Sequence, residues 1–319
     1  MINFNKKTFK SELTDKQKKD FAKNLGLKIQ CDKYYDYYLS LHIENDPHIL
    51  TKYEQYLDFV SKVGDGGFDY RIEKSNLAID YIKQDPAHQE IINKDFNNIN
   101  FSKKTPDYKI NKYYLSLDLV QANWNIYKNY TKVYSSITWE QFLRNKFEIH
   151  PFFQDLKSLR QFIFGKLGIH KRIVNLQKEF ISTVYNNLNN YQNKVVGISE
   201  DEIIFELNSP DEQESLQKYI SSILIKSSII KYPIRYKLYQ YNIFINGTEE
   251  INVKSYFEYN KPLHRELFGV PKNKHWWYYK KYILNETPNK KDLSYENDSQ
   301  ISYWYDKDLT LIQRIKNYL

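Results

Sequence analysis

The chain has 319 residues, with 47 Lys and Arg against 39 Asp and Glu, a net charge of +8 and a pI of about 9.0. This length suits one elaborate domain or two domains of about 150 residues each. Its one cysteine, Cys31, excludes an intramolecular disulfide and a cysteine-based structural zinc site, so we expect a protein of the reducing, intracellular environment of the cytoplasm. No segment approaches the ~20 apolar residues of a membrane helix, and the first ten residues lack the apolar core of a signal peptide. The basic charge permits a nucleic-acid partner without identifying one.

The first part of the chain is predicted to be mainly helical. An amphipathic helix from about Ser11, with Phe21 turned inward, is expected to stop at Gly26. Two helical pieces follow, broken at Asp46-Pro47, because the residue before a proline is disfavoured in the helical conformation.

A glycine cluster and a polar stretch separate these helices from the rest. The cluster Gly64, Gly66 and Gly67 lacks the residues of a phosphate-binding loop and therefore predicts a turn. Residues 84–112 are polar and rich in asparagine, which indicates a connection.

The middle of the chain alternates between strand and helix patterns. Residues 113–118 predict a strand because β-favouring tyrosines lead into alternating leucines, and helical spacing resumes after it. Two or more further helices are expected, one at 139–147 and then 156–165 continuing into 171–188.

The second half is predicted to hold a hairpin, a helix and a second hairpin, at residues 195–207, 209–228 and 234–259. Residues 199–202 form the turn of the first hairpin, and Ser209-Pro210 is a typical helix start. Asn246-Gly247 is a typical turn for the second hairpin. This order predicts an α+β fold, an antiparallel sheet with helices packed beside it. We expect three regions: a helical one, a central core and a basic aromatic one, at residues 1–110, 111–260 and 261–319.

Carboxylates stand where two of the predicted strands end or turn. Asp118 ends the first strand, and Asp201 and Glu202 lie in the turn of the first hairpin. If these strands pair, the acids meet at one edge of the sheet and can share divalent cations about 3.5 to 4 Å apart, as in two-metal phosphoryl transfer. The alternative is that each acid only forms a turn.

A resemblance to a known family begins in the segment YYLSLDLVQANW. It is similar to the first palm motif of family A DNA polymerases, the bacterial DNA polymerase I type. Leu115, Ser116, Asp118 and Gln121 match that motif, and Asn123 stands where the family has glutamate.

Two more motifs of that family follow in the family's order. The segment KSLRQFIFG resembles the second motif, with arginine in place of lysine, and SEDEIIFEL resembles the third. The matching residues are Arg160, Phe164 and Gly165 in the second motif and Asp201, Glu202, Phe205 and Glu206 in the third. The resemblance implies that the sheet is a palm.

The resemblance also implies a metal site. Asp118 and Asp201 would bind two Mg²⁺ or Mn²⁺ ions, the backbone carbonyl of Leu119 would be a further ligand, and Glu202 would complete the catalytic set.

The remaining motif residues are implied to contact the nucleotide. Arg160 and Lys157 would neutralise the triphosphate, Phe164 would stack on the base or sugar, and Gln121 and Asn123 would line the nucleotide site. Asparagine in place of the family's glutamate would weaken exclusion of a ribose 2′-hydroxyl. From the residues alone, Arg160 and Lys157 are more typical of a solvated helix face, and the helical spacing of Phe162, Phe164 and Leu167 is more typical of core positions.

The function that follows is template-directed DNA or RNA synthesis, primase-like synthesis included. The implied partners are a DNA or RNA primer-template and nucleoside triphosphates, with no membrane. Two alternatives stay open: a non-catalytic nucleic-acid-binding or scaffold protein with a degenerate palm, and an interaction protein without a nucleic-acid role. Basic and aromatic residues interleave in KNKHWWYYKKY, which suits either a single-strand contact or a packed aromatic cluster.

Overall fold

The computed structural model describes residues 9–27, 36, 39–40, 43, 47–65, 67–93, 101–132, 134, 136–226, 232–258, 261–268, 274–283, 285–288, 294–297 and 300–303. The chain divides into two compact units, one of residues 1–70 with 267–319 and the other of residues 71–266. Both terminal segments thus belong to one unit, whereas the sequence suggests three consecutive regions divided after 110 and 260.

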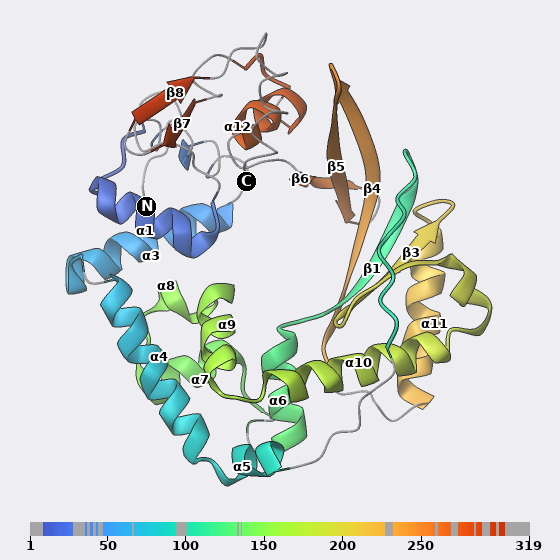
Figure 1. Cartoon of the computed structure of the whole chain (residues 1–319), viewed down its shortest axis with the longest axis horizontal. Helices are drawn as coiled ribbons and strands as arrows, with labels where there is room; N and C mark the ends of the chain where they lie inside the picture. Colours follow the sequence, from blue (N-terminus) through green and yellow to red (C-terminus); the bar gives the residue numbers. More distant parts are fainter. Residues whose placement is uncertain are drawn as a thin grey trace. The chain divides into compact units, whose positions relative to one another are not determined.

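Up to residue 258 the helices and strands follow the predicted order, and further elements that the sequence did not predict come after it (Figure 1). The helices are α1 (Asp15–Leu25), α3 (Pro47–Val63), α4 (Gly67–Gln84), α5 (Pro86–Asn93), α6 (Ala122–Thr131), α7 (Trp139–Phe147), α8 (Pro151–Gln154), α9 (Lys157–Lys166), α10 (His170–Asn186), α11 (Glu212–Lys226) and α12 (His275–Tyr278), with the 3-10 helix η2 (Asn189–Lys194) and the π-helix η4 (Tyr279–Ile283). The strands are β1 (Tyr113–Leu119), β2 (Val195–Ile198), β3 (Glu202–Leu207), β4 (Ile234–Asn246), β5 (Glu249–Glu258), β6 (Lys261–Phe268), β7 (Ser294–Asn297) and β8 (Gln300–Tyr303). Within the described residues, no helix combines the length and the apolar character that spanning a bilayer requires.

The main sheet has six antiparallel strands in the order β2-β3-β1-β4-β5-β6, and all of it except the last two residues of β6 belongs to the larger unit. Helix α10 packs against β3, and Figure 1 shows α10 and α11 beside this end of the sheet. The predicted antiparallel sheet with flanking helices is confirmed as a mixed α/β architecture.

Strand β1 is buried on both faces of the sheet. Its side chains alternate, so Leu115 and Leu117 lie on one face and Tyr114 and Ser116 on the other, and all four are at most 1% exposed. Residues 101–112, here named the crossing segment, cover the second face. This double burial explains why β1 has so few polar residues.

Local signals fix several element boundaries. Helix α1 begins with a capping box at Thr14, three residues later than predicted, because Thr14 and Gln17 satisfy each other's backbone N–H groups. It ends at Gly26, as predicted, in the left-handed conformation with φ of 67°. The predicted continuous helix over 156–188 is wrong: Gly168, with φ of 75°, separates α9 from α10.

Three other predictions need smaller corrections. The polar connection contains a helix, α5, with Pro86 at its first position. Helix α11 starts at Glu212, and its predicted end at Ser228 lies outside the described residues. The turn between β4 and β5 is Gly247-Thr248, because Asn246 still pairs with Glu249.

Aromatic side chains form the core beside the sheet. Trp124 lies 5.3 Å from Trp139 and 5.0 Å from Phe142 between ring centres, and all three are fully buried. The cluster joins α6 to α7, so helical spacing of aromatics in the sequence reports core packing.

Candidate metal and nucleotide site

The three predicted catalytic acids lie at one end of the β1–β3 pair. Asp118 is directly opposite Glu202 in the register of these antiparallel strands. The backbone N–H of Leu119 donates to the carbonyl oxygen of Asp201 at 3.0 Å. The pairing between the first predicted strand and the hairpin is therefore present in the structure.

Hydroxyl groups hold two of these acids. Ser116 donates to Oε1 of Glu202, and Ser199 donates to Oδ1 of Asp201 at 3.2 Å. Ser116 precedes Asp118 by two residues, so both side chains share one face of β1.

Basic residues of β4 approach the same acids. Nη2 of Arg235 lies 2.8 Å and Nζ of Lys237 2.9 Å from Oδ2 of Asp118. Partial burial opposes ionisation of Asp118, but the hydrogen bonds and charges of Arg235 and Lys237 outweigh it and lower the pKa of this carboxyl group. Asp118 is therefore an ionised acid with cations on one oxygen.

Sequence reasoning did not identify Arg235 and Lys237. The alternation of IRYKLYQY already places Arg235, Lys237 and Tyr239 on one face of a strand. The alternation shows that these side chains share a face, but it does not show which strand lies beside them. The register of the folded sheet does so, because it sets Arg235 opposite Asp118.

The donor chemistry of this edge fits a hard divalent cation. Asp118, Asp201 and Glu202 offer carboxylate oxygens, the ligands that Mg²⁺ prefers. Among the residues described, no three His, Cys, Asp or Glu side chains form a group that could hold a metal ion. Arg235 and Lys237 occupy Oδ2 of Asp118, so a cation would bind other oxygens or displace them.

The remaining residues of the first motif point toward helices. Gln121 adopts the left-handed conformation with φ of 45° and donates to Oε1 of Glu140 in α7 at 2.6 Å. Asn123 accepts a hydrogen bond from Gln177 of α10 at 3.2 Å. Both side chains therefore have protein partners.

Arg160 of α9 lies near the same glutamate. Burial lowers the pKa of this guanidinium, and the charges of Glu140 and Asp155 partly offset that effect. Within the described part of the chain, the Arg160 side chain makes no hydrogen bond or ion pair. A half-buried guanidinium without a direct partner is suited to an anion. Lys157, one turn earlier, is exposed.

Phe164 lies in the core. It is 1% exposed and 5.9 Å from both Tyr127 and Trp139 between ring centres. The structure thus has the core position that the sequence left as the alternative to base stacking. On the same helix Phe162 is 37% exposed, although the helical spacing grouped it with the core.

The aromatic tail segment is also packed. Trp277 and Tyr278 are 5% and 1% exposed, with ring centres 5.1 Å apart. Nζ of Lys281 lies 4.8 Å above the Trp277 ring. These contacts match the packed-cluster alternative for this segment.

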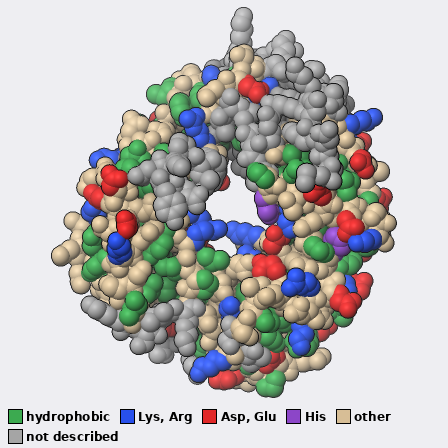
Figure 2. All heavy atoms as spheres, turned by 180° about the vertical axis from the view of Figure 1, so that it is seen from behind, with side chains coloured by type: hydrophobic (Ala, Val, Ile, Leu, Met, Phe, Trp, Pro, Cys, Tyr) green, Lys and Arg blue, Asp and Glu red, His purple; other side chains and the backbone are tan. Residues whose placement is uncertain are grey.

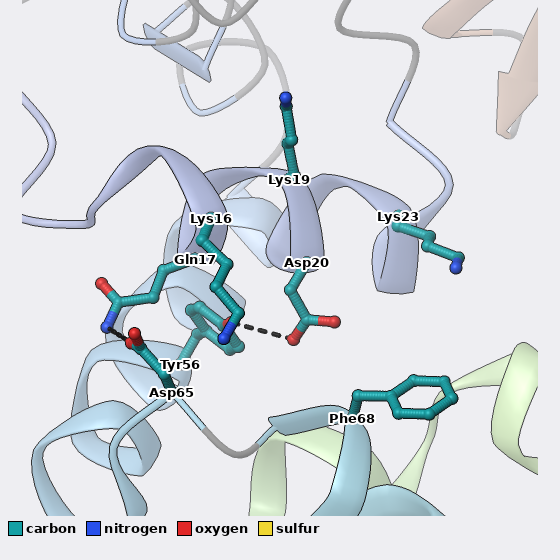
Figure 3. A pocket seen from close by; sticks show the side chains of 8 residues that line it. All are labelled: Lys16, Gln17, Lys19, Asp20, Lys23, Tyr56, Asp65 and Phe68. Carbon is teal, nitrogen blue, oxygen red and sulfur yellow. Dashed lines mark hydrogen bonds between the residues drawn. The ribbon is translucent and has the colours of Figure 1, made fainter.

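A separate pocket of about 230 Å³ lies in the smaller unit (Figure 3). Its acids are already hydrogen-bonded, Asp20 to the Tyr56 hydroxyl at 2.9 Å and Asp65 to the Gln17 amide at 2.5 Å. Its volume is below the range of about 300 to 1,000 Å³ typical of small-molecule sites. It is lined by Lys16, Gln17, Lys19, Asp20, Lys23, Tyr56, Asp65 and Phe68, none of them a predicted site residue.

On the face of the molecule that Figure 2 shows, charged side chains of both signs are mixed. The net charge of +8 is thus less informative than the local contacts of Asp118. The chain matches none of the protein-family models, curated proteins or solved structures with which it was compared.

Proposed function

We propose that the protein is a metal-dependent nucleotidyltransferase that extends a DNA or RNA primer on a template. The observation that carries this proposal is the register that sets Asp118 opposite Glu202, with Asp201 next in the chain. These acids come from segments more than 80 residues apart in the sequence, and their position at one end of the β1–β3 pair supports the arrangement that the resemblance to family A polymerases implies.

The residues present suit the steps of such a reaction. The 3′-hydroxyl of a primer loses its proton to solvent and attacks the α-phosphorus of a nucleoside triphosphate; the new O3′–phosphorus bond forms as the bond from the α-phosphorus to pyrophosphate breaks, and pyrophosphate leaves. Asp118 and Asp201 would hold Mg²⁺ or Mn²⁺, which stabilises charge on the attacking and leaving oxygens when bound. Glu202, fixed by Ser116, would hold the acidic turn in register.

Arg160 is the residue best suited to the triphosphate. Its partly desolvated guanidinium offers donors in a fixed fork that matches phosphate oxygens. Gln121 of the first motif donates to Glu140, and the charge of Glu140 also acts on Arg160 of the second motif.

A second candidate is a non-catalytic nucleic-acid-binding protein. The ion pairs of Asp118 with Arg235 and Lys237 favour it, because in this arrangement cationic side chains already neutralise the acid that would bind metal.

Primer extension distinguishes the two candidates. Purified protein is incubated with labelled DNA or RNA primer-templates, Mg²⁺ or Mn²⁺, and either deoxyribonucleotides or ribonucleotides. We expect metal-dependent products from the wild type and none from Asp201→Asn, while Asp80→Asn, an exposed position on α4, keeps full activity. Equal products from the wild type and Asp201→Asn would reject the metal role. Salt-sensitive oligonucleotide binding without product would favour the second candidate.

A further inference from the structure

The crossing segment is tied to the edge strand of the acidic hairpin. The backbone groups of Lys104 and Ile198 exchange two hydrogen bonds, of 3.0 and 2.8 Å. Nζ of Lys104 also donates to the carbonyl oxygen of Val195 at 2.5 Å. Strand β2 is therefore paired on both sides, with β3 and with this segment.

A glycine permits the close approach of the crossing segment. A Cβ atom placed on Gly197 would lie 2.6 Å from Cγ of Pro106 and 3.2 Å from Cδ1 of Ile204. Pro106 therefore rests directly on the backbone of β2, and any larger residue at position 197 would push the two apart.

An ion pair joins the segment to the acidic turn itself. Nζ of Lys103 lies 2.5 Å from Oε1 of Glu200, the residue before Asp201. This hydrogen bond is the main reason that the pKa of Glu200 is lowered. The contact holds the turn from the side opposite to β1.

The far end of the segment is anchored across the sheet. The Tyr108 ring stacks on Tyr241 of β4 at 4.8 Å, and its hydroxyl lies 3.0 Å from that of Tyr239. Nζ of Lys109 lies 2.9 Å from Oε2 of Glu206 in β3. The segment thus spans β2, β3, β1 and β4, with the acids on the face that it covers.

We propose that the crossing segment is a clamp that positions the acidic turn of the β2–β3 hairpin, with Lys103, Pro106 and Gly197 as positioning residues. The structural role of the clamp does not depend on the proposed function. Only the statement that the acids it holds are catalytic rests on that function. It fixes the hairpin against β1, so that Asp201 and Glu202 keep their register with Asp118.

Hydrogen exchange on the full chain tests the clamp without any assay of activity. In Gly197→Ala we expect at least about tenfold faster exchange of protected amides in residues 195–207, including those paired with β1, with no change in α6 and α10. The double variant Gly197→Ala with Pro106→Gly removes the contacting ring and should restore most of the protection. Gly165→Ala is the matched control, because an added Cβ there has nothing within 4 Å.

A milder variant keeps the test decisive if Gly197→Ala does not fold. Lys103→Ala removes one ion pair at a largely exposed side chain, and we expect about threefold faster exchange confined to the turn. Unchanged exchange there, an equal increase in α6 and α10, or no restoration by Pro106→Gly would overturn the clamp.

Primer extension adds the link to function. The Mg²⁺ concentration for half-maximal extension should rise at least about threefold in Gly197→Ala and return toward the wild-type value in the double variant. If the wild type makes no product, the nucleotidyltransferase proposal fails while the exchange experiment still decides on the clamp. If product forms and the metal dependence is the same in all variants, the clamp has no role in positioning the acids.

Discussion

Asp118 and Glu202 lie directly opposite each other on the neighbouring strands β1 and β3. Two acids at such positions repel each other, and the sheet is destabilised unless other groups compensate. Ser116 does so for Glu202, and Arg235 and Lys237 do so for Asp118. Two opposed acids at the end of a strand pair contribute nothing to a sheet that has only a structural role. Their presence therefore supports a role in chemistry.

Asp118→Asn should separate catalysis from stability. We expect primer extension to fall at least about 100-fold, because a neutral amide cannot stabilise the developing charge through a bound cation. The free energy of unfolding should change by less than about 1 kcal/mol, because the Arg235 side chain is 57% and the Lys237 side chain 34% exposed, so that water screens both ion pairs. Denaturant unfolding with extension assays measures both. A loss of several kcal/mol would instead mark Asp118 as a structural residue.

Lys237→Met should raise the pKa of Asp118. The lysine is one of two cations that keep this carboxyl group ionised, and Arg235 alone would compensate burial less well. Because the folded-state pKa of Asp118 is lowered, its stabilising effect is present above the ordinary value of about 3.9 and is lost as the pH falls below it. Carboxyl-detected NMR titration of both proteins measures the shift. An unchanged Asp118 titration would show that Arg235 alone determines it.

His88 should make stability sensitive to mild acid. Its ring is fully buried, and burial lowers the pKa despite the nearby Leu167 backbone and the Asp85 carboxylate, which favour protonation. The unfolded chain therefore binds more protons than the folded one below about pH 6.5, so stability is full above that pH and falls as the pH drops toward the folded-state pKa.

His88→Phe tests this assignment. The ring lies beside Tyr127, at 6.2 Å between centres, where an apolar aromatic can pack. The variant should lose the decrease in stability below about pH 6.5, measured by denaturant unfolding at a series of pH values. The same pH profile in both proteins would assign the effect to another group.

Phe164 and Phe162 form a matched pair on α9. Phe164→Ala should lower the free energy of unfolding by about 3 to 5 kcal/mol, because it opens a cavity between Tyr127 and Trp139. Phe162→Ala, at a side chain 37% exposed, should cost less than about 1.5 kcal/mol. Thermal unfolding of both variants measures these two losses of stability. If Phe164→Ala keeps wild-type stability but weakens nucleotide binding, the stacking role implied by the family would regain support.

The sequence by itself determined the local elements that carry the acids. Alternation in residues 113–118 and 195–207, with turn-forming acids between or after them, predicts a strand ending at Asp118 and a hairpin turning at Asp201. Backbone preferences act over a few residues, so such signals are readable without the fold. The stop of α1 at Gly26 has the same origin.

The tertiary structure alone decided which of these elements meet. Period-two alternation places Arg235 and Lys237 on one face of β4, but only the strand order makes Asp118 their neighbour. The contact between Pro106 and Gly197 likewise joins residues far apart in sequence, which no local pattern reports. Helical spacing put Phe162 and Phe164 in one group, and the packing of α9 against Tyr127 and Trp139 buried only the second. Such pairings depend on the summed burial and hydrogen bonding of the whole sheet and its helices, so they are fixed only when the chain is folded.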